Sequence, residues 1–348
     1  MNKVHKVKSS KKTKNIKKSN KKALVVGSVV IDTLFDLSSN IKDHINLKDG
    51  VLDVQNLMFT AHSKKEYYGG TAANISYGLG LLKQKPILAS VVGKDFALNY
   101  KKHLKNVGVD LRVHEDKEGF SANFYGMSDL NKEQIGIFLP NVYGEYVENI
   151  SLSKILSNKD FAQIGIAIFS AGTAKSITSH IVEFKKKVRL SSPAGSANGG
   201  QAKKDALTIF DPGQILMSSF DKVMLKKCLE NTDILIGNEV EISQINKHFG
   251  FSFEEIFKLG VTNIIETQGD KGSIVYTKEG SKKIPAVKVK KSIDPTGAGD
   301  AFRSGLIHGL LSGQKIEDAM EIGSVMGALC VQSSGGQAYK ISSKNKKS

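Results

Sequence analysis

The 348-residue sequence has no tryptophan, only two cysteines and no long apolar run. Cys228 and Cys330 lack the spacing of metal ligands and lie in apolar-patterned segments, which predicts buried free thiols in a reducing compartment. No run approaches the roughly 18 apolar residues that a membrane-spanning helix needs. The basic start of the chain also lacks the apolar segment of a secretory signal. We therefore expect a cytoplasmic protein with no membrane partner, and we exclude a disulfide-stabilised scaffold.

Acidic residues are missing from both ends of the chain, which explains much of a formal net charge of +16. Residues 1–22 contain ten lysines and residues 340–348 contain four more, which leaves +2 for residues 23–339. Because both ends are almost free of apolar side chains, we expect disordered tails around one folded domain. The lysine run is typical of weak electrostatic binding to nucleic acid, although a solvated tail without a partner explains it equally well.

Apolar, β-branched runs alternate with helical patterns between the tails. This alternation predicts an α/β fold with a mainly parallel central sheet and helices on both faces. The expected strands are residues 23–32, 87–92, 161–170, 207–211, 234–237 and 261–267. The expected helices are residues 73–82, 96–107, 174–187, 225–229, 239–249, 253–259, 300–311 and 316–331. A hairpin of residues 273–276 and 286–289 should follow the last parallel strand.

Two segments interrupt this alternation, namely parts of residues 33–68 and 109–139. The second contains short alternating pieces (residues 111–114, 121–126 and 135–139) in place of a helical pattern. We interpret both segments as a small β lid on the edge of the sheet. Residues 191–201 (SSPAGSANGGQ) are rich in helix breakers and predict a flexible insertion, to which we assign no function.

The most informative stretch is residues 294–302 (DPTGAGDAF). Its proline favours an extended approach, its glycines allow a tight turn, and a helical pattern begins after them. A glycine-lined helix start gathers free N–H groups and the positive end of the helix dipole, which suits a phosphate. A carboxylate at the same corner, Asp300, makes sense as a base that takes a proton from an attacking hydroxyl. The alternative is that Asp300 is an ordinary helix N-cap.

Three other segments accompany this nonapeptide in a consistent order along the chain. They are residues 69–78 (GGTAANISYG), 238–241 (NEVE) and 267–272 (TQGDKG). On these four segments the chain resembles the ribokinase-like (PfkB) carbohydrate kinase family over roughly residues 23–340. The resemblance implies a three-layer ribokinase-like fold with a β lid. It also implies phosphoryl transfer from ATP with Mg²⁺, without the Walker A loop that this sequence lacks.

The resemblance also assigns site residues. Asp300 would be the catalytic base, with backbone donors at Gly297, Ala298 and Gly299 stabilising the transferred group. The substrate would be held by Asp32, which can accept two hydroxyl groups, and by Gly69, Gly70 and Asn74. Without the resemblance, an aspartate at a strand end is more often a turn former, and the alternative for Asn74 is a buried residue after a glycine turn.

The nucleotide side is assigned in the same way. The resemblance places Asn238, Thr267, Gly269 and Gly272 at ATP and Glu241 at the metal ion. From the residues alone, a capping box explains Asn238 and Glu241 equally well, and a plain hairpin turn explains the other three. Several relatives also need a monovalent cation such as K⁺ beside residues 294–302.

The acceptor is expected to be a nucleoside. Arg303, residues 138–141, 211–214 and 335–339 resemble the adenosine-kinase-like branch of the family. A purine needs a stackable apolar wall, which Phe124 and Phe138 would supply. Phe120 and Tyr125 are further candidates, and we expect at least two of these four aromatic residues to be ordinary packing.

The resulting hypothesis is an ATP-dependent adenosine kinase that phosphorylates the ribose 5′-hydroxyl in purine salvage. The alternative within the family is a sugar kinase of the ribokinase or fructokinase type. A non-enzymatic protein that uses its lysine tails on a degenerate kinase fold is a third possibility, and the intact Asp300 argues against it. The sequence is compatible with a monomer or a homodimer.

Overall fold

The computed structural model describes residues 21–45, 47–48, 51–52, 57–191 and 206–341. Most of the predicted tails 1–22 and 340–348 and of the insertion 191–201 lie outside these described residues. Lys21 and Lys22 are exceptions, because Lys22 opens the first strand and its ammonium group pairs with Asp110 at 3.2 Å. The folded body therefore includes Lys22, one residue before the predicted boundary.

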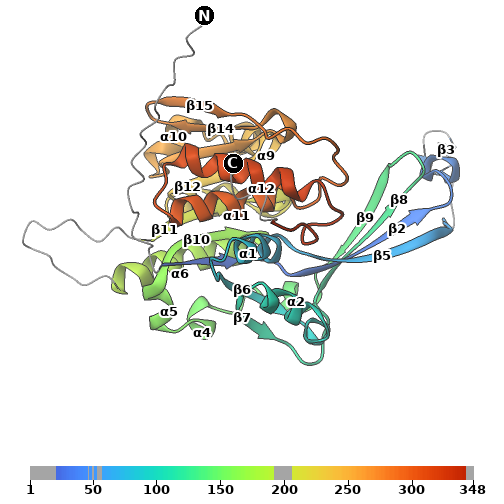
Figure 1. Ribbon diagram of the computed structural model, residues 1–348, viewed down its shortest axis with the longest axis horizontal. Helices are drawn as coiled ribbons and strands as arrows, with labels where there is room; N and C mark the ends of the chain where they lie inside the picture. The colour runs from blue at the N-terminus through green and yellow to red at the C-terminus, as the bar shows by residue number, and fades with distance from the viewer. Residues whose placement is uncertain (1–20, 46, 49–50, 53–56, 192–205, 342–348) are drawn as a thin grey trace, which may run out of the picture.

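A nine-stranded sheet forms the centre of the described structure, in the order β15-β14-β13-β12-β11-β10-β1-β6-β7 (Figure 1). The strands from β13 to β7 are parallel to their neighbours, and β14 and β15 are added as an antiparallel hairpin. The bounds are β1 (Lys22–Val26), β6 (Ile87–Val92), β7 (Asp110–Glu115), β10 (Ile164–Ser170), β11 (Leu207–Asp211), β12 (Ile234–Asn238), β13 (Asn263–Thr267), β14 (Ser273–Thr277) and β15 (Gly280–Ile284). The predicted mainly parallel sheet is confirmed.

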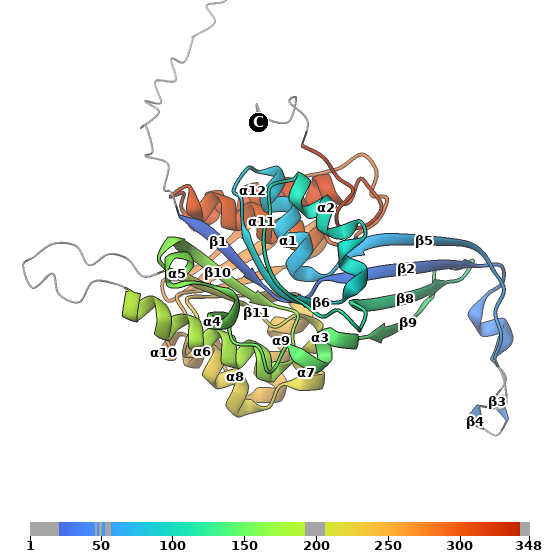
Figure 2. The same cartoon turned by 90° about the horizontal axis from the view of Figure 1, so that it is seen from below.

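Helices cover both faces of this sheet, and each face has its own apolar core (Figure 2). One layer consists of α1 (Thr71–Leu81), α2 (Tyr100–Asn106), α11 (Ala298–Leu311) and α12 (Ile316–Cys330). The other consists of α4 (Leu152–Ile155), α5 (Asn158–Gln163), α6 (Ala174–Ser191), α7 (Leu216–Ser219), α8 (Lys222–Leu229), α9 (Glu239–Phe249) and α10 (Phe253–Lys258). The remaining helical segments are α3 (Asn141–Tyr146) and the 3₁₀ turns η1 (Ile41–His44), η2 (Lys94–Ala97), η3 (Gly213–Ile215) and η4 (Gly269–Lys271).

A second sheet extends away from the body and forms the lid (Figures 1 and 2). Its order is β5-β2-β8-β9, with a short β3–β4 pair beyond it. The bounds are β2 (Val30–Leu37), β3 (Leu47–Lys48), β4 (Val51–Leu52), β5 (Ala61–Gly69), β8 (Ala122–Ser128) and β9 (Gln134–Leu139). The lid predicted from the two interrupting segments is therefore present, but it starts at Val30.

Four strand predictions were wrong in detail. Residues 161–163 of the predicted strand 161–170 belong to helix α5, and the strand begins at Ile164. Residues 23–32 form two strands in different sheets, because the chain leaves the central sheet at Gly27, where a side chain would overlap the Ser170 carbonyl oxygen. Residues 111–114 belong to β7 of the central sheet and not to the lid, since they follow α2 in a parallel β-α-β crossover. The second hairpin strand is residues 280–284 and not 286–289, and Pro285 follows its last residue.

Candidate active site

The predicted anion-binding turn opens α11. Gly297 is the N-cap residue and has φ +77°, a conformation that favours glycine. A side chain on Gly297 would also crowd the backbone of Gly336. The turn therefore brings the start of α11 against residues 335–337, near the end of the described chain. This close approach is the physical reason for a glycine at this position.

The first-turn N–H groups of α11 have no partner four residues back, so they and the helix dipole create a positive potential in front of the helix. The N–H of Ala298 is the exception, because it donates to the Pro295 carbonyl oxygen at 3.1 Å. Ala298 therefore does not present a free donor as predicted. Gly297 and Gly299 stay predicted donors, and the first-turn N–H of Asp300 is a further one.

Asp300 lies in this first turn and is partly buried. The Nδ2 group of Asn74 donates to its Oδ2 atom at 2.8 Å. Burial raises the pKa of Asp300 to about 7, with Arg303 and the Asn74 hydrogen bond lowering it and Asp211 and Glu241 raising it. A carboxylate whose pKa lies near neutral pH is well suited to act as a general base.

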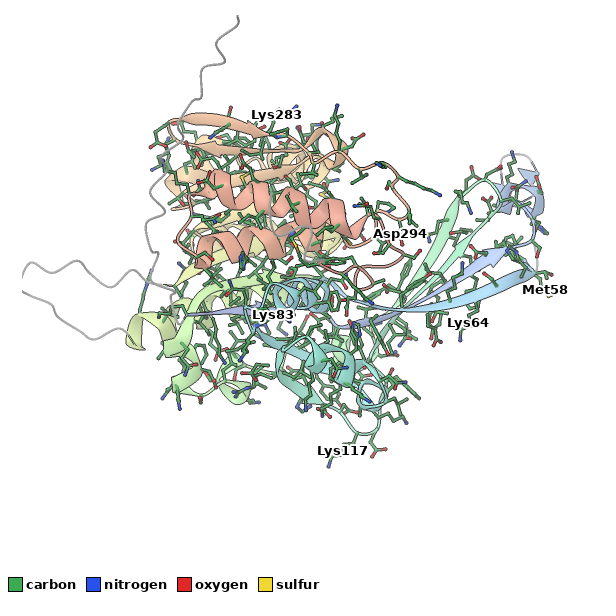
Figure 3. All side chains as sticks on the ribbon, viewed as in Figure 1. Met58, Lys64, Lys83, Lys117, Lys283 and Asp294 are labelled. Carbon is green, nitrogen blue, oxygen red and sulfur yellow. The ribbon has the colours of Figure 1, made fainter. Side chains whose placement is uncertain are left out.

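Asp32 lies within the lid strand β2 and not at the end of a central strand as predicted. Its carboxylate occupies the space beside Gly69, where any side chain would overlap it. Gly70 has φ +89°, and a side chain there would crowd the backbone of residues 28–30. Burial, followed by the charges of Asp300 and Asp294, raises the pKa of Asp32 to about 7. The negative charges of Asp300 and Asp32 therefore disfavour each other where the lid meets the body. In Figure 3, Asp294 marks this side of the body.

One cross-strand row of the lid places aromatic side chains beside Asp32. The row across β5, β2, β8 and β9 is Tyr67, Asp32, Phe124 and Phe138. Directly paired residues share one face of a sheet, so these four side chains point to the same side. The ring of Phe124 lies over Gly126 and Gly136, where added side chains would crowd it. The lid thus presents an aromatic surface next to a carboxylate.

The other two lid aromatics lie elsewhere. Tyr125 pairs with Thr33 and Ile137, so it is on the opposite face of the lid. Phe120 lies before β8, with the Lys94 ammonium group 4.5 Å from its ring centroid. Neither residue belongs to the row beside Asp32.

The structure contains a buried ion pair between Arg303, one turn after Asp300 in α11, and Asp211. The sequence assigned no chemical role to either residue. The Nε atom of Arg303 is 2.6 Å from Oδ2 of Asp211, and its second guanidinium nitrogen donates to Oδ1 at 2.8 Å. Arg303 also donates to the Gly299 carbonyl oxygen at 3.1 Å. The sequence signal that could have predicted the pair is an arginine within an apolar helical pattern, because a buried arginine needs an acidic partner. The pair connects the end of β11 to the first turns of α11.

Asn238 and Glu241 form the capping box that was the alternative for them. The N–H of Glu241 donates to Asn238 Oδ1, and the N–H of Asn238 donates to Glu241 Oε2, each at 2.8 Å. Burial, followed by the charge of Asp211, raises the pKa of Glu241. Asn238 is exposed at the end of β12. A capping role leaves Glu241 Oε1 and the exposed Asn238 available for a further role.

Three predicted nucleotide-side residues lie at the neighbouring strand end. Thr267 pairs with Asn238 across β13 and β12, and its hydroxyl donates to the Gly237 carbonyl oxygen at 3.3 Å. Gly269 faces open space, whereas a side chain on Gly272 would overlap the Ile284 carbonyl oxygen. The structure therefore explains Gly272 by packing and leaves Gly269 accessible.

Asn74 is buried, and both the nitrogen and the oxygen of its side-chain amide form hydrogen bonds. Its Nδ2 group reaches Asp300, and its Oδ1 atom accepts from Gln337 Nε2 at 2.9 Å. Gln337 was noticed in the sequence only as part of residues 335–339. A contact between Asn74 and ribose stays a prediction, and the second hydrogen of its NH₂ group is the one that such a contact would use.

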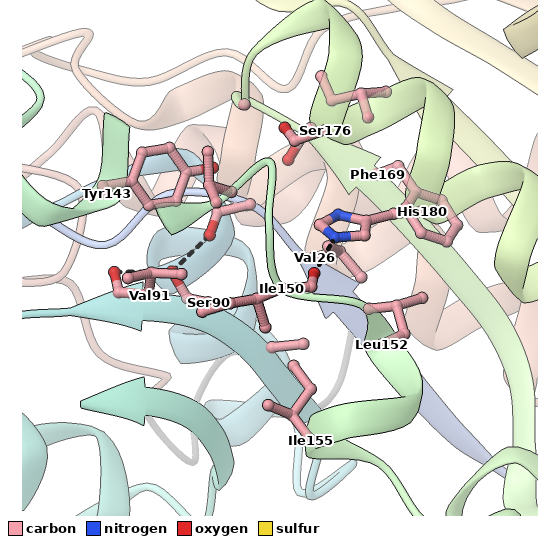
Figure 4. A pocket seen from close by; sticks show the side chains of 16 residues that line it. Val26, Ser90, Val91, Tyr143, Ile150, Leu152, Ile155, Phe169, Ser176 and His180 are labelled. Atoms are coloured by element: carbon pink, nitrogen blue, oxygen red, sulfur yellow. Dashed lines mark hydrogen bonds between the residues drawn. The ribbon is translucent and has the colours of Figure 1, made fainter. Parts of the chain in front are cut away.

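A separate small cavity lies beside α6 (Figure 4). Its volume of about 20 Å³ has room for about one water molecule. His180 lines it and bonds to the Ile150 carbonyl oxygen at 2.8 Å, and no predicted site residue lines it. Across the described ranges, no helix could span a membrane, and no cluster of three or more His, Cys, Asp or Glu side chains could hold a metal ion.

The chain is similar to known kinases over most of its length. It is 30% identical to a nucleoside kinase of Methanocaldococcus jannaschii over 279 residues, which cover 79% of this chain and 82% of the relative. The crystal structure of the Methanocaldococcus jannaschii nucleoside kinase, described as an archaeal member of the ribokinase family, matches with a TM-score of 0.76 at 26% identity. That match covers 92% of this chain and 94% of the other.

A second solved structure is the nucleoside kinase of Burkholderia thailandensis in complex with inosine. It matches with a TM-score of 0.73 at 27% identity and covers 93% of this chain and 95% of the other. These similarities confirm the predicted ribokinase-like fold. The family model for pfkB family carbohydrate kinases matches residues 20–343. The chain therefore belongs to the pfkB family of carbohydrate kinases.

Proposed function

We propose that this protein is a nucleoside kinase that transfers the γ-phosphoryl group of MgATP to the ribose 5′-hydroxyl of a purine nucleoside. The observation that carries the proposal is the pair Asp32 and Asp300, each with a pKa near 7, between an aromatic lid face and the start of α11. The similarity to nucleoside kinases supports the choice of acceptor. A sugar kinase is the alternative within the same family.

The chain's own residues have complementary roles in this reaction. Asp32 accepts hydrogen bonds from two hydroxyl groups of the ribose, because a carboxylate can accept several hydrogen bonds at once. This contact orients the ribose so that its 5′-hydroxyl meets Asp300, which takes the proton as the oxygen attacks the γ-phosphorus. The N–H groups of Gly297 and Gly299 stabilise the negative charge on the transferred group. The proton ends on Asp300, and ADP is the leaving group.

The nucleotide would lie at the ends of β12 and β13. Asn238 and Gly269 are accessible there, Thr267 is half-buried beside them, and the backbone around Gly269 can approach phosphates closely. Gly272 supports the same turn through packing. Mg²⁺ binds through one or two carboxylates together with phosphates and water, which suits a site without a protein cage. Glu241 would hold a water of the ion, and the metal would neutralise charge on the phosphates.

A substrate panel with MgATP tests the proposal. We expect kcat/KM to be higher for adenosine, inosine or guanosine than for ribose and fructose, because only a base can stack on the Phe124 and Phe138 face. An aromatic pair adds about 0.5–1.5 kcal/mol beyond burial, which is about a 2- to 12-fold preference for each well-placed ring. A higher value for ribose or a hexose than for every nucleoside would establish the sugar-kinase alternative. The ranking of adenosine against inosine decides whether adenosine is the preferred base.

The proposal also covers the monovalent cation, the cellular location, the lysine-rich tail and the oligomeric state. We expect K⁺ to raise the activity compared with choline, a proposal that rests on the resemblance alone. The two buried free thiols and the use of ATP support a cytoplasmic place in purine salvage. Binding of residues 1–22 to nucleic acid is proposed from their ten lysines. Analytical ultracentrifugation would distinguish a monomer from a homodimer.

A further inference from the structure

We propose that Gln337 is a positioning residue for the reaction, because it sets the direction of a hydrogen-bond chain that aims the amide N–H of Asn74 at the catalytic Asp300. The inference rests on the proposed phosphoryl transfer. It concerns a residue that makes no contact with Asp300 itself and acts through Asn74.

The chain of hydrogen bonds begins at the lid and ends at the base. The Tyr100 hydroxyl donates to the Gly69 carbonyl oxygen at the end of β5. Gln337 Nε2 lies 2.6 Å from the Tyr100 oxygen and 2.9 Å from Asn74 Oδ1. Asn74 Nδ2 then donates to Asp300 Oδ2 at 2.8 Å. The residues come from β5, α1, α2, α11 and the segment after α12, so only the tertiary fold brings them together.

The direction of every bond follows from the chemistry at the two ends. A backbone carbonyl can only accept, so the Tyr100 hydroxyl hydrogen is committed to Gly69 and its oxygen must accept. The partner of that oxygen must be a donor, which requires the NH₂ side of the Gln337 amide. The second hydrogen of this NH₂ group requires an acceptor, so Asn74 turns its oxygen to Gln337. The NH₂ group of Asn74 is thereby aimed at Asp300.

Burial makes this direction hard to reverse. Gln337, Tyr100 and Asn74 are only 5%, 2% and 6% exposed. A flipped Gln337 amide would turn its oxygen to two acceptors, the Tyr100 oxygen and Asn74 Oδ1. A flipped Asn74 amide would turn its oxygen to the Asp300 carboxylate. Acceptors that face each other are costly in a buried site. Asn74 engages one carboxylate oxygen, Oδ2, and so holds the rotation of the Asp300 side chain. The other oxygen, Oδ1, is left to take the hydroxyl proton.

The lid packs on the same segment. Tyr68 of β5 stacks on Tyr100, with ring centroids 4.4 Å apart and planes at 20°. The Tyr67 ring lies against Gly335, where an added side chain would crowd it. A cavity of about 120 Å³ between β5 and residues 334–338 borders Gln337. The lid that carries Asp32 and the segment that carries Gln337 therefore share one interface.

Several ionisable groups surround this series of hydrogen bonds and must be considered in any pH experiment. Those around Asp300 and Gln337 are Arg303 of α11, Asp211 of β11, Glu241 of α9, Asp32 of β2, Cys330 of α12, Tyr100 and His103 of α2, and Tyr339. Gln337 itself does not titrate. A change in the pH profile after substitution of Gln337 therefore reports on these neighbours, with Asp300 linked to it by a single intervening residue.

The decisive variant is Gln337→Glu, in which an acceptor-only carboxylate replaces the donor. Asn74 should turn its NH₂ group to the new carboxylate and present its oxygen to Asp300. We expect kcat at pH 7 to fall about 10- to 100-fold, the range for losing a hydrogen bond to a charged group. The midpoint of the kcat/KM profile should move up by about one pH unit, because the ionised base loses a donor. The KM for ATP should stay within about twofold of the original value.

Two further variants keep the test decisive. Gln337→Met preserves volume and removes the donor, so it should also lower kcat and raise the midpoint, and it decides the matter if Gln337→Glu does not fold. The matched control is Gln332→Glu, at an exposed glutamine of the same segment, which should leave both quantities unchanged. Folding of each variant is checked by its thermal midpoint. A folded Gln337→Met enzyme with an unchanged pH midpoint would overturn the proposal. An inactive parent enzyme would instead refute the kinase function itself.

Discussion

Replacing Asp300 with asparagine should make the protein more stable while it removes most of the activity. The carboxyl pKa rises from 3.8 to about 7 on folding, so folding disfavours the charged form that the reaction needs. At about 1.4 kcal/mol per tenfold change in proton affinity, the cost at a pH above 7 is at most about 4 kcal/mol. Asp300 is partly exposed, and water entry reduces this figure, so we expect about 1–2 kcal/mol.

The sign of the pH dependence follows from linkage. Because the folded pKa is raised, the carboxyl contributes its full stability below the unfolded pKa and loses it as the pH rises through about 7. Asparagine does not ionise, so the stability gain of Asp300→Asn should be small near pH 4 and largest near pH 8. A gain of about 1–2 kcal/mol corresponds to a rise of about 1.5–3 °C in the thermal midpoint of a chain this long.

The assay compares thermal midpoints of the original protein and Asp300→Asn at pH 5 and pH 8, at one scan rate. Asp43→Asn, at an exposed lid position, is the control and should show the same small difference at both pH values. In parallel, kcat of Asp300→Asn should fall about 100-fold or more, with the KM for ATP unchanged. An equal stability change at both pH values, or a loss of stability at pH 8, would refute the argument that burial of the charged base costs stability.

Four further predictions concern the acceptor site and the tail. The kcat/KM for the nucleoside should increase as the pH rises through about 7, because Asp32 and Asp300 must both be ionised, and the measured midpoint belongs to the pair. Gly69→Ala should raise the acceptor KM much more than the ATP KM in steady-state assays, since the new methyl group overlaps the Asp32 carboxylate; equal effects would mean general misfolding. Phe124→Ala should raise the nucleoside KM about 2- to 12-fold and leave the ribose KM unchanged, and equal changes would remove the stacking role. Deleting residues 1–20 should leave kcat unchanged and abolish any RNA retention that weakens between low and moderate salt; a folded but inactive truncation, or retention insensitive to the deletion, would contradict this.

Local sequence signals predicted the parts of the fold that depend on neighbouring residues. The glycines of residues 294–302 and the apolar pattern after them were sufficient to locate the turn and α11. The alternation of buried strands and helices was sufficient for the parallel sheet, since inner strands such as β1, β6 and β10 are buried on both faces. The break at Gly27 was not predictable, because residues 23–32 are predominantly apolar and the crowding atom belongs to Ser170 of another strand. Contacts between distant segments cannot be predicted from the sequence of one segment alone.

The same distinction explains the candidate site. Asp300, Asn74 and the glycines stand in local motifs, and the resemblance located them. Arg303 and Gln337 belong to segments that the resemblance singled out, but their contacts could not be predicted, because their partners Asp211 and Asn74 are 92 and 263 residues away along the chain.

Arg303 and Gln337 both affect the charge of Asp300, the proposed base. The charge of Arg303 lowers the pKa of Asp300, and so does the hydrogen bond from Asn74, whose amide Gln337 orients. Burial raises the pKa of Asp300, and these two groups limit the rise to about 7. A base held near neutral pH by opposing effects is sensitive to each of them, so substitutions that never touch a substrate should still change its pH profile.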